Sequence, residues 1–190
     1  MKKTLSMLLA GAMLATALTG CGGSASSSSD SQNSGSDSTA SGTAFKIGGT
    51  GPLTGANAIY GNACKNGAQI AVDEINAEGG DIQFELNYQD DESDAEKAVN
   101  AYNTLKDWGM QLSLGSVTSK PCEATAAENY SDRIFALTPS ASSVAVTEGK
   151  DNVFQMCFMD PNQGTASAQY IAEQKLGTKV AIIWKNDDVY

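Results

Sequence analysis

The sequence contains no histidine, and its four cysteines form no C-x-x-C pair. Zinc sites and Cys/His catalysis depend on these residues, so we expect no metal site, no cofactor and no catalytic residue. Basic residues are also scarce, because 12 Lys and Arg stand against 22 Asp and Glu, a net charge of −10. This excess of negative charge would repel a polyanion, so we expect no nucleic-acid partner.

The chain also lacks an apolar run of the length that spans a bilayer, which is about 20 residues. The uncharged stretch from Leu5 to Leu18 is shorter, follows Lys2 and Lys3, and gives way to a serine-rich tract. This order of a positive start, an apolar middle and small residues is typical of a secretory signal. We therefore predict a signal peptide at 1–20 and a mature protein without a transmembrane helix.

The segment Leu18-Thr19-Gly20-Cys21 resembles the lipobox of bacterial lipoproteins. The resemblance implies that a diacylglyceryl group is attached to Cys21 and that the chain is cut before it. An ordinary secretory signal that happens to precede a cysteine is the alternative. Residues 21–44 are mostly Ser, Gly, Ala and Thr, which cannot build a core. We expect them to tether the protein to the extracytoplasmic face of the cell membrane, with a reach of roughly 25–30 Å.

From residue 45 onward, segments with strand periodicity alternate with segments of helical spacing. Ile82, Phe84, Leu86 and Tyr88 alternate with polar residues, whereas Ser93 and Glu96 have the spacing of a capping box. We predict strands at 45–49, 82–88, 110–115, 134–137, 153–158 and 180–184. The predicted helices are 60–78, one from Ser93 to about 108, one opened by Pro121, and 160–176. This alternation predicts an α/β fold with a mostly parallel sheet.

The cysteines after Cys21 are odd in number, namely Cys64, Cys122 and Cys157. In an exported protein one disulfide is possible, and at least one thiol then stays free or pairs with another chain. The alternative is that all three are small buried apolar residues. Both interpretations are compatible with the sequence.

Polar loops after the first, third and fourth strands are the predicted site. Parallel sheets bind ligands at the carboxyl ends of their strands, beside helix N-termini, and Gly-, Ser- and Thr-rich loops suit a small anionic or zwitterionic group. A nucleotide-binding site is an alternative, because Gly49-Thr50-Gly51 after a strand matches the start of the motif G-x-G-x-x-G. However, Thr54 stands where this motif has its third glycine. The acidic pair Asp90-Asp91 also lies about 40 residues downstream, where about 20 is usual. We interpret that pair as solvated or helix-capping.

Short motifs in a fixed order then indicate a family. From Phe45 to Tyr190 the chain resembles the type I periplasmic solute-binding proteins, especially the leucine/isoleucine/valine-binding receptors of branched-chain amino acid ABC importers. The motifs are Gly51-Pro52-Leu53-Thr54-Gly55, Asn66-Gly67-Ala68, Asp73-Glu74-Ile75-Asn76-Ala77-Glu78-Gly79-Gly80, Gly115-Ser116, Thr138-Pro139-Ser140-Ala141-Ser142 and Asp160-Pro161-Asn162-Gln163-Gly164.

The resemblance implies a flavodoxin-like parallel sheet flanked by helices, in a receptor that captures a small amino acid between two lobes. The ligand would be a branched-chain amino acid, delivered to the membrane subunits of an ABC permease. Residues 45–157 would be the N-terminal lobe, and 158–190 the hinge crossing and the start of a truncated second lobe. A receptor for an amide, urea or aromatic amino acid, or a secreted α/β enzyme, are the alternatives.

The resemblance also implies ligand contacts. Ser119 would bind the carboxylate, and the segment Ser140, Ala141 and Ser142 would contact the carboxylate and the ammonium. Tyr60 would form a wall for the ligand side chain, and Tyr190 would close over it from the second lobe. Each also has a structural interpretation: a helix cap for Ser119, turn residues for the serines after the fourth strand, and a packing aromatic for Tyr60.

The chain departs from the family in one respect. The leucine-type receptor has a disulfide where this sequence has Ser93 and Thr118. Because Cys64 and Cys122 both fall near helix starts at the same sheet edge, a replacement bridge between them is conceivable.

Overall fold

The computed structural model describes residues 43–183. The predicted signal peptide, Cys21, Trp184 and Tyr190 lie outside these residues, as does nearly all of the predicted tether. The described part contains one five-stranded parallel sheet in the order β2-β1-β3-β4-β5. This is the flavodoxin-like order, so the predicted fold class is confirmed.

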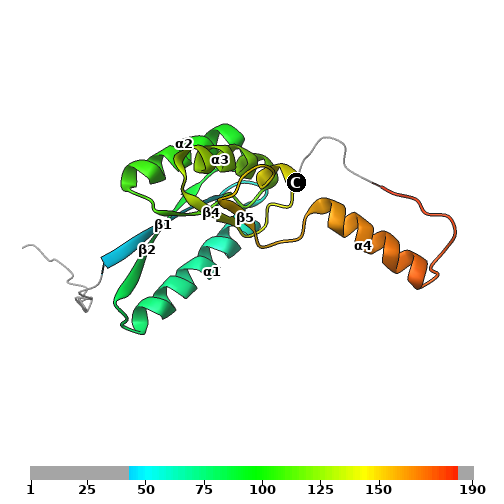
Figure 1. The fold of residues 1–190 in the computed structure, drawn as a ribbon, viewed down its shortest axis with the longest axis horizontal. Coiled ribbons are helices and arrows are strands. Elements are labelled where there is room, and N and C mark those ends of the chain that lie inside the picture. The colour runs from blue at the N-terminus through cyan, green and yellow to red at the C-terminus, as the bar shows by residue number, and fades with distance from the viewer. Residues whose placement is uncertain (1–42, 184–190) are drawn as a thin grey trace, which may run out of the picture. The chain divides into compact units, whose positions relative to one another are not determined.

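The strands and helices follow the predicted order along the chain (Figure 1). The strands are β1 Thr43–Gly51, β2 Ile82–Asp90, β3 Leu112–Leu114, β4 Phe135–Thr138 and β5 Val153–Gln155. The helices are α1 Ala58–Ala77, α2 Ala95–Trp108, α3 Ser119–Asp132, the short 3₁₀ helix η1 Val144–Val146, and α4 Asp160–Glu173.

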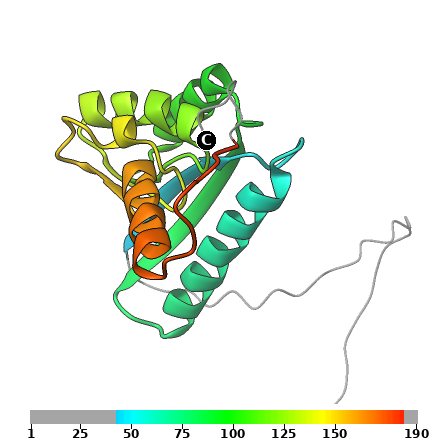
Figure 2. The same cartoon turned by 90° about the vertical axis from the view of Figure 1, so that its right-hand side faces the viewer.

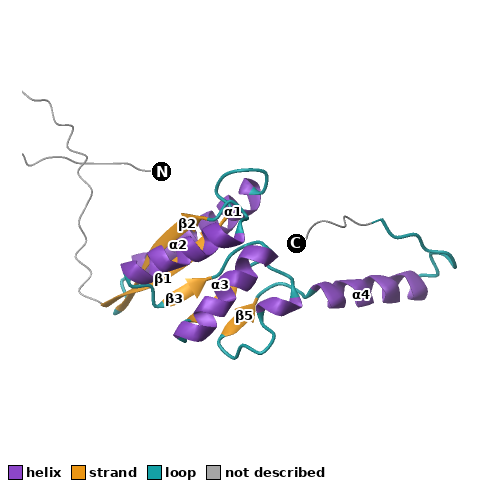
Figure 3. Cartoon of the chain, turned by 90° about the horizontal axis from the view of Figure 1, so that it is seen from above, coloured by secondary structure: helices purple, strands orange, loops and turns teal. Residues whose placement is uncertain are grey.

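The helices α1, α2 and α3 cover both faces of the sheet. The chain moves from β1 to one neighbour, β2, and then returns past β1 to β3, so right-handed crossovers place α1 on one face and α2 and α3 on the other. Figures 1 and 2 show this division, and Figure 3 shows α2 and α3 side by side. The reversal of direction lies between β1 and β3, which is where such sheets bind ligands.

Side chains between the sheet and the pair α2 and α3 form the core. One cluster contains Tyr102, Leu105 and Met110, and a second contains Cys122, Ala126 and four further residues: Ala136, Ala141, Val146 and Val153. The second cluster extends under the loop after β4. The packing of the α3 face therefore reaches the predicted ligand edge.

Helix boundaries differ from prediction by a few residues because local contacts decide them. The cap of α2 is Asp94, which accepts the Lys97 N–H at 2.9 Å, so the capping residue stands one position after the predicted Ser93. α3 begins at Ser119, two residues before Pro121. Met110 lies outside β3 because its N–H donates a hydrogen bond to the Leu105 carbonyl at the C-terminal end of α2.

The predicted strand 180–184 is wrong over its described residues. Residues 180–183 have no regular structure, and Ile183 is 99% exposed. A strand needs a neighbour for its N–H and C=O groups, and no described strand pairs with this segment. Similarly, β5 ends at Gln155, after which Met156 makes the last ladder bond to the Thr138 carbonyl.

The conceivable bridge between Cys64 and Cys122 is absent. The three described cysteines are free thiols, with Cys122 buried and Cys64 and Cys157 partly buried. Cys64 belongs to α1 and Cys122 to α3, and these helices lie on opposite faces of the sheet (Figure 1). The shared edge that suggested the bridge therefore does not bring the two thiols together.

Candidate functional site

Three exit loops and one helix N-terminus meet at the carboxyl edge of the sheet. The loops follow β1 (52–57), β3 (115–118) and β4 (139–143), and the helix is α3. Because all strands are parallel, their exit loops share one edge. The N-terminus of α3 adds a partial positive charge to that edge, which favours an anion.

The structure brings Ser119 beside the loop after β4. The Ser143 N–H donates a hydrogen bond to Ser119 Oγ at 3.3 Å, and the Ser143 hydroxyl donates to Glu123 Oε1 at 2.5 Å. Both acceptors belong to the first turns of α3. Two segments that are about 20 residues apart in sequence are therefore joined by hydrogen bonds, and Ser119 itself is fully buried at this junction.

The loop itself is held from the β5 side. Gln155 Nε2 donates to the Ala141 and Ser143 carbonyls at 2.7 and 3.1 Å, and the Cys157 thiol donates to the Ala141 carbonyl at 3.1 Å. The Ala141 N–H donates to Thr138 Oγ1 at 3.2 Å. Ala141 and Ser142 are buried and Ser140 is partly buried, so the loop is a fixed structure.

Thr118 is a further candidate site residue, which was not predicted from the sequence. It is the N-cap residue of α3 and is buried, but its hydroxyl makes no cap bond, and Oγ1 has no partner among the described residues. A buried hydroxyl without a partner is costly, so Thr118 is a candidate to form a hydrogen bond with a ligand at this edge. The signal in the sequence was its position directly before Ser119.

Tyr60 lies in the first turn of α1, directly after the exit loop of β1. Its side chain is 48% exposed, so the ring stands at the same edge and is open to solvent. Asp90 shapes the same loop by accepting the Leu53 N–H at 2.7 Å and the Thr54 hydroxyl at 2.6 Å. Burial raises the pKa of Asp90, but these bonds and one from the Glu92 N–H outweigh it and lower the pKa overall.

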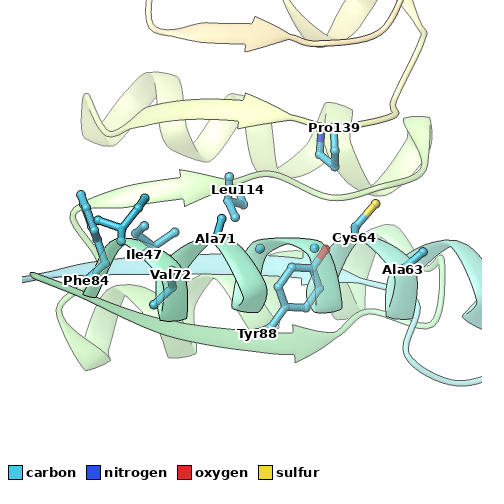
Figure 4. Close-up of a pocket in the computed structure, with 12 residues that line it drawn as sticks. Ile47, Ala63, Cys64, Ala71, Val72, Phe84, Tyr88, Leu114 and Pro139 are labelled. Atoms are coloured by element: carbon cyan, nitrogen blue, oxygen red, sulfur yellow. The ribbon is translucent and has the colours of Figure 1, made fainter. Parts of the chain in front are cut away.

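A separate apolar pocket of about 380 Å³ lies between α1 and the sheet (Figure 4). Its lining is aliphatic and aromatic apart from the Tyr88 hydroxyl and the Cys64 thiol, and burial raises the pKa of both groups. It offers no charged side chain to a carboxylate or an ammonium. The polar edge and this pocket are therefore different features.

None of the helices between residues 43 and 183 is long and apolar enough to cross a membrane. Within the same range, no three His, Cys, Asp or Glu side chains gather as a metal site.

The fold and its polar edge define a flavodoxin-like α/β domain of the kind that binds small molecules at the carboxyl ends of its strands. Residues 44–190 match the family model described as periplasmic binding protein. The chain belongs to this family, in its type I branched-chain amino acid group, and this confirms the predicted membership.

Relatives and solved structures agree with this membership. The Leu/Ile/Val-binding protein BraC3 of Rhizobium johnstonii is 36% identical over 143 residues, which cover 72% of this chain and 38% of that protein. LivJ of Streptococcus pneumoniae, solved in complex with isoleucine, has a TM-score of 0.64 at 32% identity, covering 70% of this chain and 39% of LivJ. LivK of Thermotoga maritima has a TM-score of 0.61 at 28% identity, covering 69% and 37%. The chain thus spans about two fifths of the lengths of these proteins.

Proposed function

We propose that this chain belongs to a lipoprotein receptor that captures a branched-chain amino acid for an ABC importer. The observation that carries the proposal is the hydrogen-bonded junction of Ser119 and the 140–143 loop at the N-terminus of α3. The names of similar proteins support the ligand class, since BraC3 is a Leu/Ile/Val-binding protein and LivJ was solved with isoleucine. No covalent chemistry is required for such a role.

Each proposed contact has a physical basis. Ser119 at the start of α3 offers a hydroxyl to the ligand carboxylate, where the helix dipole also favours negative charge. Ser140, Ala141 and Ser142 contribute main-chain and hydroxyl contacts to the carboxylate and ammonium. Tyr60 forms the wall for the aliphatic side chain, and Tyr190 covers the ligand from a second lobe.

We further propose the domain arrangement that this role requires. Residues 45–157 form the N-terminal lobe, and 158–190 form a hinge crossing and the start of the second lobe. The chain spans about two fifths of its relatives, so a second lobe would come from sequence corresponding to their remaining length. An acidic residue of that lobe would bind the ammonium.

The first twenty-one residues suit this location. A signal peptide at 1–20 and a lipid on Cys21 would hold the receptor at the extracytoplasmic face of the membrane, near its permease. Mass spectrometry of the mature N-terminus tests this directly. An unmodified or uncleaved Cys21 would contradict the anchor and leave the receptor role standing.

The ligand is tested by calorimetric titration of the two-lobed receptor with a panel of amino acids, amides and urea. We expect L-leucine, L-isoleucine or L-valine to bind, and Ser119→Ala to weaken binding by about 10- to 100-fold, since a hydrogen bond to a charged group is lost. Ser131→Ala, near the other end of α3, is the matched control and should bind like the wild type. Binding of only an amide, urea or an aromatic amino acid would change the ligand class, and no binding at all would overturn the proposal.

A further inference from the structure

Asp91 is fully buried, at 0% exposure, although it directly follows β2 in an acidic stretch. The interpretation of Asp90-Asp91 as a solvated or capping pair is therefore wrong for Asp91. Its N–H donates to the Gly51 carbonyl at 3.1 Å, and its Oδ1 accepts the Ser93 N–H at 2.9 Å. Its second carboxyl oxygen, Oδ2, is buried with no partner of good geometry among the described residues.

Two buried hydroxyls lie beside this carboxyl group. Thr50 Oγ1 and Ser116 Oγ are 2.5 Å apart, and both residues are buried. Burial raises the pKa of Asp91, while the Ser93 N–H and the Ser116 and Thr50 hydroxyls act against that rise. Each hydroxyl has one hydrogen, and the bond between the two uses only one of them. The second hydrogen needs an acceptor, and the free oxygen of Asp91 is beside it.

The same network continues from Ser116 to the loop after β4. The Ser116 carbonyl accepts the Thr138 hydroxyl at 2.8 Å, and Thr138 Oγ1 in turn accepts the Ala141 N–H at 3.2 Å. Thr138 is also buried. A buried path of hydrogen bonds therefore joins the exits of β1, β3 and β4 and ends in the loop that contains Ser140, Ala141 and Ser142, while Asp91, after β2, lies beside its first pair of hydroxyls.

We propose that Asp91 is a positioning residue for the candidate ligand site, acting through Ser116 and Thr138 and without touching the ligand. The hydrogen bond between Thr50 and Ser116 uses one of their two hydroxyl hydrogens, and the carboxylate of Asp91 accepts the other. This fixes the Ser116 backbone, whose carbonyl orients Thr138 and thereby the Ala141 N–H. The ligand role of that loop rests on the function proposed above, whereas the positioning itself does not.

Two substitutions and one rescue test the path. Asp91→Asn keeps an oxygen for the Ser93 N–H but replaces the other oxygen with an NH₂ group, which cannot accept a hydrogen bond. Thr138→Val removes the connecting hydroxyl, and Thr138→Ser retains it. Asp132→Asn is the matched control, because Asp132 also joins two elements, by accepting the Tyr102 hydroxyl at 2.8 Å, but lies at the C-terminal end of α3.

The measurement is amide hydrogen exchange of the 190-residue chain, with global stability followed by urea denaturation. We expect Asp91→Asn and Thr138→Val to speed exchange at residues 140–143 by about tenfold or more relative to any global change, as loss of a buried hydrogen bond loosens a local unit. Thr138→Ser should match the wild type, and Asp132→Asn should leave this loop unchanged. Unchanged loop exchange in Asp91→Asn, or equal changes in Asp91→Asn and Asp132→Asn, would overturn the proposal.

If Asp91→Asn does not fold, the comparison of Thr138→Val with Thr138→Ser tests the proposal instead. Equal amide exchange of the loop in these two variants would show that the Thr138 hydroxyl does not hold the loop, and would overturn the proposal. L-leucine titration of the two-lobed receptor then separates the two proposals. Faster loop exchange together with weaker leucine binding supports both. Faster loop exchange in a receptor whose wild type binds no leucine supports the positioning role and contradicts the proposed ligand.

Discussion

At the scale of single residues, Gly61 determines how closely α1 approaches the exit loop of β1. It is buried in the first turns of α1, and a Cβ atom at this position would lie 2.0 Å from the Pro52 carbonyl oxygen. Asn62 continues the contact by donating from Nδ2 to the Leu53 carbonyl at 3.0 Å. The loop that leads to Tyr60 is therefore held against its own helix.

The first prediction contrasts two glycines of this helix. Gly61→Ala should lower the free energy of unfolding by about 2 kcal/mol or more, because the backbone of Pro52 cannot yield to the new methyl group. Gly67→Ala meets nothing within 4 Å and should raise the free energy of unfolding by about 0.5–1 kcal/mol through helix propensity. Urea denaturation measures both, and similar effects of the two substitutions would contradict the close contact at Gly61.

At the scale of elements, α2 and α3 are joined at the edge opposite the ligand site. Asp132 accepts the Tyr102 hydroxyl at 2.8 Å and pairs with Lys106 Nζ at 2.5 Å. These two partners lower the pKa of Asp132, with Lys106 the larger cause. The carboxylate is only partly buried, so the ion pair contributes modestly.

The second prediction concerns the pH dependence of this junction. The pKa of Asp132 is lower in the folded state than in the unfolded state. Its contribution to the free energy of unfolding is therefore complete above the pKa of the unfolded state. That contribution is lost as the pH falls through the pKa of the folded state, below about pH 4. Asp132→Asn should lower the urea midpoint at pH 7 and flatten its dependence on pH below about 4. An unchanged pH profile in this variant would show that Asp132 is not stabilised by its partners.

At the scale of the whole molecule, the helices cover the sheet unequally among the described residues. α1 packs on β1 and β2, whereas Phe135 and Phe154, on β4 and β5, stack at 5.3 Å and remain about half exposed. α4 has no buried residue. Parallel sheets are usually covered on both faces, so the β4 and β5 side of this sheet is less covered than usual among the described residues.

The third prediction follows from the proposed two-lobed receptor. The 190 residues alone should bind L-leucine at least about 100-fold more weakly than a chain with both lobes, since closure of two lobes buries the ligand and supplies contacts from both sides. Calorimetry on both chains measures the ratio. Equal affinities would show that one lobe holds the whole site, and would contradict the proposed roles of Tyr190 and of the second-lobe acidic residue.

Local patterns in the sequence were sufficient for the order and type of most elements. The period-two alternation from Ile82 to Tyr88 predicted β2, although the burial of the strand does not follow that alternation, since Ile82 is exposed and Gln83 is buried. Capping chemistry placed the start of α2 to within one residue, since a side-chain acceptor for the first N–H groups is a local requirement. The motifs from Gly51 to Gly164 then sufficed for the family, because they occur in order at fixed spacing.

Only the tertiary structure decided the matters that depend on residues far apart in the chain. It buried Asp91 beside Thr50 and Ser116, left the Thr118 hydroxyl without a partner among residues 43–183, and separated Cys64 from Cys122 on opposite faces of the sheet. Residues 180–183 likewise have strand propensity, but none of the described strands lies beside them. The physical reason is the same in each case: periodicity and capping act over a few residues, whereas burial and hydrogen-bond partners are set by which strands and helices become neighbours.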